Sequence, residues 1–306
     1  MAKELNFDFM KLRNAAMILS AILLLISIAS LATRGLNLGL DFTGGTLLEV
    51  SYQQPADIQN IRSKLEASGF TDSTVQNFGS ETEVLIRMAE AYRDTLGAEV
   101  LEALRAGDAS NPVELRRSEF VGGQVGEELR DQGGLALLMA LFVVMLYVAF
   151  RFQFKFSVGA VFALFHDVVI ILGIYSLFQF EFDLTVLAAL LAVIGYSLND
   201  TIVVSDRIRE NFRIIRQMAP IDIINRSLTQ TLGRTIVTSL TTLIVLLALL
   251  WVGGELIHYF ALALTIGVVV GTYSSIYVAA NVLLAMEISR DDLIPPETEE
   301  EVDDRP

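Results

Sequence analysis

Apolar residues along this chain are collected into six long runs, and charged stretches separate the runs from one another. A helix that crosses a membrane needs about 20 predominantly apolar residues. The pattern therefore predicts a polytopic α-helical membrane protein with six transmembrane helices. The predicted spans are Asn14–Ala32, Gly134–Phe150, Ser157–Phe178, Leu184–Ser205, Thr235–Val252 and Phe260–Met286.

The first run has a second interpretation, as a cleaved signal peptide. Lys3, Lys11 and Arg13 precede it, and Ser30–Ala32 at its end could form a cleavage site. The apolar core of a signal peptide has about 7–15 residues, however, and this run is longer. Its length favours an uncleaved membrane anchor.

The distribution of lysine and arginine predicts the orientation of the chain. These residues are enriched in the short loops on the cytoplasmic side of a membrane protein. With the N-terminus inside, the inside segments hold 13 of the 22 Lys and Arg residues, and the short outside loops 179–183 and 253–259 hold none. We therefore expect a multi-pass protein of the bacterial inner membrane with both termini in the cytoplasm.

The segment between the first two spans predicts a small periplasmic α+β domain. Its elements follow the order β-α-β-β-α-β, which is typical of a ferredoxin-like unit. The segment lacks histidine and cysteine, so we expect it to bind or dock rather than to catalyse. The predicted elements are strand Thr46–Tyr52, helix Ala56–Ala67, strands Thr74–Phe78 and Thr82–Met88, helix Glu90–Leu104 and strand Val113–Val121.

The chain thus divides into four predicted parts. These are the N-terminus with the first span (1–33), the periplasmic domain (34–131), the remaining five spans (132–286) and an acidic, disordered cytoplasmic tail (287–306). A basic amphipathic segment, 207–230, is expected to lie along the inner membrane surface, where anionic lipids attract it.

Three ionisable residues fall at membrane depth, where charge is costly and therefore points to function. Asp200 lies in the fourth span, Arg234 begins the fifth and Asp167 lies near the middle of the third. One hypothesis is a proton relay in which Asp200 changes its charge near Arg234. The other is a static buried ion pair that holds helices in register. His166 is interpreted as structural.

Polar and small residues surround these positions. Asn199 and Thr201 flank the aspartate of the fourth span, and we include both in the candidate proton path. The G-x-x-x-G pair Gly267 and Gly271 is typical of close helix packing. The hydroxyl-bearing stretch that opens the fifth span could line a wet path or bond its own helix backbone, and both interpretations stay open. It comprises Thr235, Thr238, Ser239, Thr241 and Thr242.

Composition excludes several function classes. The net charge of −14 argues against a nucleic-acid partner, because binding phosphates needs a basic surface. The chain has no cysteine and only two histidines, so we expect neither a thiolate nor a His-rich metal site, and no cofactor. No nucleotide-binding loop or nucleophile–base set is visible, which argues against an enzyme.

Four motifs, in their order and spacing, closely resemble the SecF family of protein-export membrane subunits, within the SecD/SecF group of the resistance-nodulation-division superfamily. The resemblance covers nearly the whole chain. The motifs are GLDFTGGT at Gly39–Thr46, GYSLNDTIVVSDRIREN at Gly195–Asn211, RSLTQTLGRTIVTSLTT at Arg226–Thr242 and GVVVGTYSSI at Gly267–Ile276.

The resemblance implies partners and a mechanism. It implies a complex with SecD, close to the SecYEG channel and to YajC, that uses the proton-motive force to promote late-stage export of unfolded polypeptides. In that family the aspartate of the N-D-T motif and the arginine of the G-R-T motif belong to the proton path, and these fall on Asp200 and Arg234. The motif that opens the outside domain contributes Gly39, Asp41, Gly44 and Gly45.

Two other function classes are open at this point. A small-molecule exporter of the same superfamily usually carries two six-helix units and larger outer domains, and this chain has neither. A scaffold of the translocase that conducts no protons agrees equally well with the sequence. Replacing Asp200 would separate the scaffold from a proton-coupled subunit.

Overall fold

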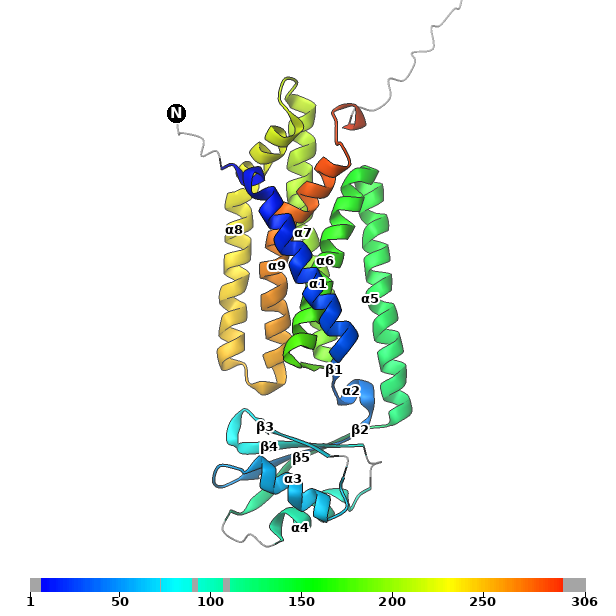
Figure 1. Ribbon diagram of the computed structural model, residues 1–306, viewed down its shortest axis with the longest axis vertical. Coiled ribbons are helices and arrows are strands. Elements are labelled where there is room, and N and C mark those ends of the chain that lie inside the picture. Colours follow the sequence, from blue (N-terminus) through cyan, green and yellow to red (C-terminus); the bar gives the residue numbers. More distant parts are fainter. Residues whose placement is uncertain (1–6, 72, 90–92, 107–110, 294–306) are drawn as a thin grey trace, which may run out of the picture.

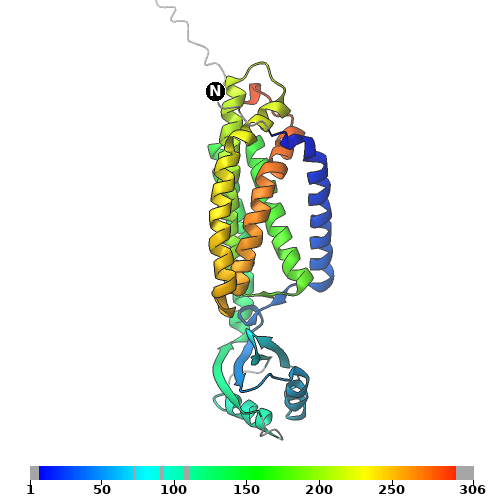
Figure 2. The ribbon, with the colours of Figure 1, turned by 90° about the vertical axis from the view of Figure 1, so that its left-hand side faces the viewer.

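Six long helices form a bundle with a small α+β domain at one end (Figures 1 and 2). This domain, residues 45–121, is called the β domain below. The computed structural model describes residues 7–71, 73–89, 93–106 and 111–293. Within these residues the helices long and apolar enough to cross a membrane are α1 (Arg13–Arg34), α5 (Gly123–Arg151), α6 (Phe154–Phe178), α7 (Leu184–Ile214), α8 (Pro220–Val252) and α9 (Glu255–Ala285). The prediction of a polytopic α-helical membrane protein is confirmed. Five predicted spans lie inside these helices, and the sixth runs one residue past Ala285.

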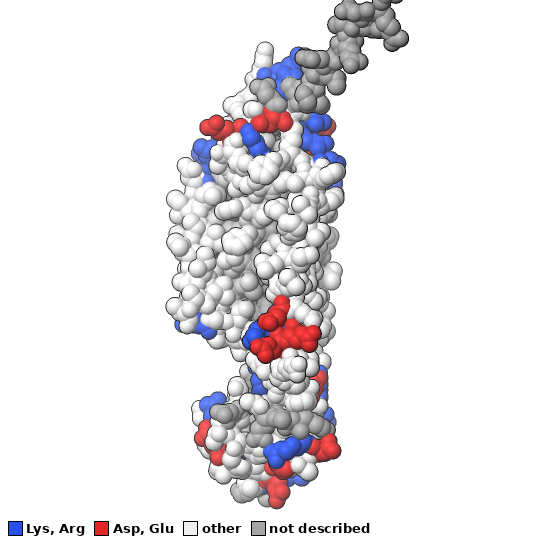
Figure 3. Space-filling view, turned by 90° about the vertical axis from the view of Figure 1, so that its right-hand side faces the viewer, with Lys and Arg blue, Asp and Glu red and all other residues white. Residues whose placement is uncertain are grey.

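The bundle has a buried centre and an apolar outside. Helices α6, α7 and α9 pack against one another, while α1, α5 and α8 cover them. Large apolar side chains on the covering helices are exposed, for example Leu25 on α1, Leu138 on α5 and Val245 on α8. On the face drawn in Figure 3 the result is a belt free of charge, with lysine, arginine, aspartate and glutamate gathered at the two ends and in the β domain. Such a belt suits the hydrocarbon layer of a membrane.

Glycines bring the central helices into close contact. A Cβ on Gly267 of α9 would lie 2.2 Å from Cγ2 of Val193, and one on Gly271 would lie 3.0 Å from Cβ of Ser197, both on α7. A Cβ on Gly173 of α6 would lie 2.1 Å from Cβ of Ser27 on α1. The G-x-x-x-G pair therefore acts as a packing surface, as the sequence predicted.

The β domain has the predicted order of elements and a four-stranded antiparallel sheet in the order β3-β4-β2-β5. Alternate residues of β2, such as Leu48 and Val50, are fully buried against α3 and α4, as period-2 patterning requires. Asp57 caps α3 by accepting hydrogen bonds from the N–H groups of Gln59 and Asn60. The elements are β2 (Gly45–Tyr52), α3 (Ile58–Ala67), β3 (Ser73–Phe78), β4 (Ser80–Met88), α4 (Leu96–Arg105) and β5 (Val113–Val121).

Two predicted boundaries differ from those in the structure. The helix predicted from Glu90 begins only at Leu96, and residues 90–92 lie outside the described residues. The tail predicted to be disordered from residue 287 begins later than predicted, because Ile288 and Leu293 are buried in a core cluster and Asp292 is hydrogen-bonded to Lys155. Residues 294–306 of the predicted tail lie outside the described residues.

Segment 207–230, expected from the sequence to lie along the inner membrane surface, is divided between two helices of the bundle. Its first part continues α7 as far as Ile214, and its last part opens α8 from Pro220. Pro220 at the first helical position suits this start, because proline lacks an N–H that the first turn would leave unpaired. Most apolar residues of both parts, such as Phe212 and Ile224, are buried in one core cluster, whereas Ile214 at the end of α7 is exposed. The amphipathic face thus meets protein, where the sequence suggested lipid.

A short joint connects the β domain to the bundle. It consists of β1 (Asn37–Leu38), which pairs in parallel with β6 (Glu181–Phe182), and the one-turn helix α2 (Leu40–Thr43). Arg87 on β4 reaches across the joint, donating to the carbonyl of Leu38 at 3.1 Å and forming an ion pair with Glu181. The opposite end of the bundle carries the start of α1 and the end of α9 (Figure 1).

Candidate functional site

Asp200 lies inside the bundle on α7 and is incompletely hydrogen-bonded. Only 3% of its surface is exposed, and its Oδ2 has no hydrogen-bond partner among the described residues. Buried polar atoms are nearly always paired, so an unpaired carboxylate oxygen at this depth requires an explanation. It is available to a water molecule, a proton or a group that approaches from outside.

Helix α8 faces Asp200. Tyr196 on α7 donates a hydrogen bond to Ser239 on α8 at 3.5 Å, and the two helices run antiparallel. Asp200 lies one turn further along α7 than Tyr196, and Thr235 lies one turn before Ser239 on α8. The buried Oγ1 of Thr235 also lacks a hydrogen-bond partner in the described structure. Two unpaired polar atoms therefore occur on matching turns of neighbouring helices.

Arg234 precedes Thr235 on α8. It is close enough to act electrostatically on Asp200, although no hydrogen bond or ion pair joins the two side chains in the described structure. Arg234 is exposed on the outside of this chain, as is Asn199 on α7, whereas Thr201 is buried and donates to the carbonyl of Ser197 at 3.0 Å. Of the predicted set, Asp200 and Thr201 thus face inward, and Asn199 and Arg234 face outward.

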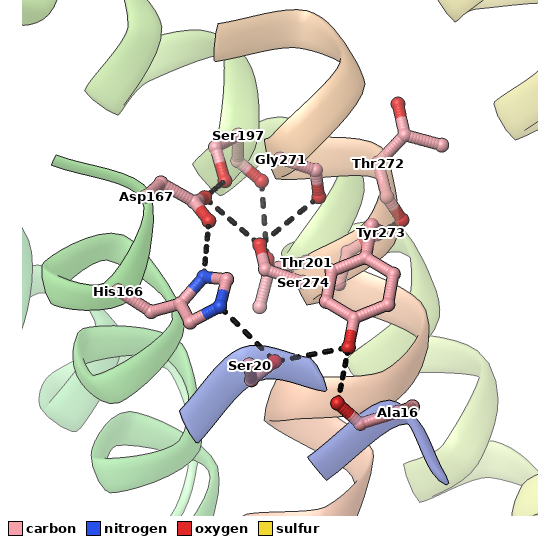
Figure 4. Close-up of polar contacts among 11 residues, drawn as sticks. Ala16, Ser20, His166, Asp167, Ser197, Thr201, Gly271, Thr272, Tyr273 and Ser274 are labelled. Atoms are coloured by element: carbon pink, nitrogen blue, oxygen red, sulfur yellow. Dashed lines mark hydrogen bonds and ion pairs between the residues drawn. The ribbon is translucent and has the colours of Figure 1, made fainter. Parts of the chain in front are cut away.

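Asp167 lies in a second polar site, which connects four helices (Figure 4). Its Oδ2 accepts hydrogen bonds from Ser197 on α7 at 2.6 Å and from Ser274 on α9 at 2.8 Å. Its Oδ1 lies 3.0 Å from Nδ1 of His166, the preceding residue. Asp167 and His166 are each only 1% exposed.

The same site extends from His166 to α1 and back to α9. Nε2 of His166 lies 3.1 Å from Oγ of Ser20 on α1, which lies 2.9 Å from the hydroxyl of Tyr273 on α9. The Tyr273 hydroxyl donates to the carbonyl of Ala16 at 2.6 Å, and its ring stacks on His166. Sequence reasoning missed Ser20, Tyr273 and Ser274. The available signal was that each places a hydroxyl inside an otherwise apolar span.

The hydroxyl-bearing stretch of α8 divides between the two interpretations left open above. Thr238, Thr241 and Thr242 donate to carbonyls of their own helix. Ser239 instead contacts Thr272 on α9 at 2.7 Å, and Thr235 is unpaired. Only the face that turns toward α7 and α9 therefore continues the polar region.

The GLDFTGG motif builds the joint. Gly44 and Gly45 have φ angles of 68° and 115°, and a Cβ on Gly45 would lie 2.4 Å from the carbonyl oxygen of Met88. These positions need glycine for conformation and for space. Gly39 donates to the carbonyl of Phe182 at 2.8 Å. Asp41 accepts a hydrogen bond at 3.0 Å from the N–H of Leu184 and so caps α7.

Two carboxyl groups outside the spans have shifted pKa values. Burial raises the pKa of Glu181 at the joint, and the charge of Arg87 opposes this rise. At the other end of the bundle, the hydrogen bond from Lys155 at 2.7 Å lowers the pKa of Asp292, and the N–H of Ser289 adds to this effect. Along the described chain, no three His, Cys, Asp or Glu residues are grouped so that they could hold a metal ion.

Comparison with known proteins identifies the family. Residues 101–289, more than half of the chain, match the family described as "Protein export membrane protein SecD/SecF, C-terminal". The chain belongs to the SecD/SecF family. Residues 29–56 also match the "SecD/SecF GG Motif", which covers the joint built by Gly44 and Gly45. The resemblance seen in the sequence motifs is confirmed.

Relatives in the SecD/SecF family are similar over almost their whole length. The chain is 52% identical to "Protein translocase subunit SecF" of Pseudomonas aeruginosa over 301 residues, which cover 98% of each chain. It is 51% identical to the protein of the same name from Vibrio alginolyticus, with 97% of this chain and 95% of the relative covered. For the Escherichia coli O157:H7 protein the identity is 46%, with 98% and 94% covered.

Solved structures of SecDF share the fold. The crystal structure of SecDF from a Thermus species matches 93% of this chain with a TM-score of 0.84 and 40% identity. The structure of SecDF in a "Super-membrane-facing form" matches 94% with a TM-score of 0.70 and 39% identity. In both cases this chain spans only 39% of the SecDF chain.

Proposed function

We propose that this SecD/SecF-family protein is a non-enzymatic subunit of the Sec protein translocase that uses the proton-motive force to promote late-stage export. The observation that carries the proton-coupled part is the state of Asp200, which is buried in α7 with one carboxylate oxygen unpaired. Family membership and SecF-named relatives of equal length support the assignment to the translocase.

Asp200 has the surroundings of a group that changes its charge. A protonated Asp200 is neutral and suits the apolar interior, whereas an ionised Asp200 is attracted to the positive charge of Arg234. The apolar interior therefore stabilises the protonated state of Asp200, and the charge of Arg234 stabilises the ionised state. A carboxylate with a purely static role would be stabilised in one state only. Thr235, with its unpaired hydroxyl on the facing turn, is placed to hold a water molecule beside the carboxylate.

The energy available from protons is sufficient for a conformational switch. Moving one charge across the membrane yields about 2.3 kcal/mol per 100 mV, and each pH unit adds about 1.4 kcal/mol. A change of that size shifts a two-state equilibrium by roughly tenfold or more. We propose that the change of charge on Asp200 alters the packing of α7 against α8 and α9, and that this moves the β domain through the joint.

The outward-facing residues near Asp200 are proposed to contact SecD. Gly195 and Asn199 are exposed one turn apart on α7, and Gly233 and Arg234 are exposed on α8. Small residues are enriched where membrane helices pack against one another, and a charged side chain that faces lipid is costly. The SecDF chains are more than twice as long as the part that matches here, so the remainder supplies a partner for this face. SecYEG, YajC and the exported polypeptide are the further partners that we propose.

The proposed orientation follows the lysine and arginine bias. The protein would lie in the inner membrane with both termini in the cytoplasm and the β domain in the periplasm. This would place the β domain where exported chains emerge.

Replacing Asp200 tests the proposal. Asp200→Asn keeps the size of the side chain and removes its charge, and Asp206→Asn is a matched control on the same helix, since Asp206 is partly exposed near Arg151 and Arg209. In membrane vesicles with an imposed proton-motive force, we expect Asp200→Asn to assemble normally but to lose the stimulation of export, while Asp206→Asn keeps it. Full stimulation by an assembled Asp200→Asn protein would contradict proton coupling and favour a scaffold.

A further inference from the structure

The side chains of Tyr273, Ser20, His166 and Asp167 are hydrogen-bonded in series and form a hydrogen-bonded chain. The donor of each contact in this hydrogen-bonded chain can be assigned in turn, starting at Tyr273. The backbone carbonyl of Ala16 has no proton, so the hydrogen bond of 2.6 Å between it and Tyr273 uses the hydroxyl proton of Tyr273. That hydroxyl has no second proton. The contact of 2.9 Å between Tyr273 and Ser20 must therefore use the hydroxyl proton of Ser20.

The same reasoning assigns a proton to the imidazole ring of His166. Ser20 has donated its only proton toward Tyr273, so its oxygen can only accept from His166. The contact of 3.1 Å between Nε2 and Ser20 therefore requires a proton on Nε2 of His166. Three contacts on three helices thus determine the state of one ring nitrogen.

The remaining contact of the ring is the one with Asp167. Nδ1 of His166 and Oδ1 of Asp167 lie 3.0 Å apart, and one proton must lie between them for this contact to be a hydrogen bond. That proton belongs either to the carboxyl group, with a neutral ring, or to the ring, with an ionised carboxylate. Both arrangements have a net charge of zero, which suits a pair that is only 1% exposed inside a membrane bundle.

We propose that His166 and Asp167 share one proton and form a second proton-holding site of the protein, whose occupancy sets the direction of the hydrogen bonds from α6 through α1 to α9. The proposal gives His166, interpreted from the sequence as structural, a role in holding a proton. It deepens the proposed function and rests on it, because a proton-holding pair serves a proton-driven subunit.

Loss of the shared proton would change a contact between helices. The ring would keep a single N–H, and the ionised Asp167 would attract it to Nδ1. Nε2 of His166 would then accept the proton of Ser20 instead of donating to it. The contact between Ser20 and Tyr273 would be left without a proton, because Tyr273 still donates to Ala16. Deprotonation therefore removes a hydrogen bond between α1 and α9 without moving any atom of the pair out of the core.

Other ionisable groups that bear on the pair come from the neighbouring helices. Helix α7 contributes Asp200, one turn from Ser197, which is about 4.5 Å along the axis. Helix α9 contributes Tyr273 and Tyr277, whose rings pack on each other. The charged residues of α1 are at its two ends, and those of α5 lie in the segment Gly123–Asp131 or at Arg151. Among the described residues of the contacting helices named above, Asp200 is thus the carboxylate that lies one turn from Ser197, the residue that bonds Asp167.

Ring-nitrogen NMR on the full-length protein in lipid bilayers tests the proton count directly. The chain has two histidines, so His258→Gln leaves His166 as the single source of imidazole signals and does not touch the chain of contacts. With ¹⁵N-labelled histidine we expect a ring protonated at Nε2, with Nδ1 either protonated or accepting a strong hydrogen bond. A neutral ring with its proton on Nδ1 alone at every pH at which the protein stays folded would overturn the proposal, because the protonated pair would then never form.

Two phenylalanine variants in the same background test the coupling to α9. Tyr273→Phe removes the acceptor that directs the hydroxyl of Ser20, so Ser20 is free to donate to Nε2, and we expect the signal to shift toward the Nδ1-protonated ring. Tyr277→Phe is the matched control, since its ring packs on Tyr273 but its hydroxyl lies outside the chain of contacts, and we expect the spectrum to be unchanged. Identical spectra for the two variants would overturn the coupling.

The NMR spectra and the export assay test the two proposals independently. The NMR spectra do not depend on export, so a wrong proton position overturns the shared-proton site even where Asp200→Asn loses export stimulation. Conversely, an Asp200→Asn protein with full stimulation contradicts proton-driven export even where His166 carries its proton on Nε2.

Discussion

Ser197 on α7 donates a hydrogen bond of 2.6 Å from its Oγ to Oδ2 of Asp167 on α6. Gly271 on α9 lies directly beside this contact, since a Cβ there would be 3.0 Å from Cβ and 3.1 Å from Oγ of Ser197. The glycine therefore lets α7 approach α9 closely enough for Ser197 to reach Asp167. A packing motif and a polar site depend on the same few atoms.

Adding one methyl group at Gly271 should disturb the polar site. Gly271→Ala would push Ser197 and weaken its hydrogen bond, and we expect a loss of about 1–3 kcal/mol of stability from overpacking. Thermal unfolding of the purified protein measures this. Gly134→Ala on α5 is the matched control, because nothing lies within 4 Å of its added Cβ, and alanine is favoured over glycine in helices by about 1 kcal/mol. Equal midpoints for Gly271→Ala and the unmodified protein would contradict this account.

Gly267 and Val193 should behave as a coupled pair. A Cβ on Gly267 would lie only 2.2 Å from Cγ2 of Val193, so Gly267→Ala alone forces the helices apart. Val193→Ala alone leaves a small cavity. In the double variant the new methyl fills that cavity, so we expect it to be more stable than the sum of the two losses indicates, by about 0.5–3 kcal/mol. A double-mutant cycle of thermal unfolding measures the coupling, and strict additivity would show that the two side chains do not meet.

The sequence predicted the six helices well because a single physical length governs them. A run of about 20 apolar residues is required by the thickness of the hydrocarbon layer, whatever the helix contacts. Asp200 was selected as a candidate from the cost of a carboxylate at membrane depth, and the structure places it in the interior of the bundle. The β domain could be predicted because apolar and polar residues alternate in strands such as Gly45–Tyr52. The burial of these residues in the structure broadly follows that alternation.

The second polar site could not be predicted in the same way. Ser20, Tyr273 and Ser274 carry hydroxyls, and a hydroxyl in a span can always bond its own helix, as Thr238 does. Which of them meets His166 depends on how the helices are rotated, and that is decided by packing between distant parts of the chain. The environment of segment 207–230 could not be predicted for a related reason, because an amphipathic pattern does not tell whether its apolar face meets lipid or protein.

The ion pair of Arg87 and Glu181 should hold the β domain to the bundle. Each side chain is 19% exposed, and Arg87 also donates to the carbonyl of Leu38. Arg87→Ala would leave Glu181 buried without its partner, so we expect a loss of about 1–3 kcal/mol and faster hydrogen exchange in β1, β4 and β6. Glu181→Gln should be milder, because burial already raises the pKa of Glu181 and a neutral side chain avoids that cost.

A second ion pair in the β domain serves as the control for this experiment. Arg117 and Glu119 are both on β5, and each side chain is 39% exposed. Glu119→Gln should leave exchange at the joint unchanged, since the described ion pair of Glu119 is with Arg117 on its own strand, even though both side chains line the same cavity as Glu181. Faster exchange at the joint in both Arg87→Ala and Glu119→Gln would show that the effect comes from general loosening of the domain.

Asp292 should make the end of the bundle opposite the β domain sensitive to acid. The hydrogen bond from Lys155 lowers the pKa of Asp292 below the ordinary aspartate value of about 3.9. Between the lowered and the ordinary pKa the unfolded chain binds more protons than the native one, so stability rises with pH there. The contribution is complete above about pH 4 to 5 and is lost as the pH falls through the native pKa.

The difference in unfolding temperature between the unmodified protein and Asp292→Asn measures this contribution. We expect the difference to be constant from neutral pH down to about pH 5 and then to shrink as the pH falls through the lowered pKa of Asp292. Glu210→Gln at the same end is the control, because Glu210 is largely exposed and its ion pair within the described residues is with Arg207, one turn away on α7. Its effect should be small at every pH, as is usual for exposed ion pairs. A difference for Asp292→Asn that persists unchanged in strong acid would mean that the side chain acts there through packing and not through its charge.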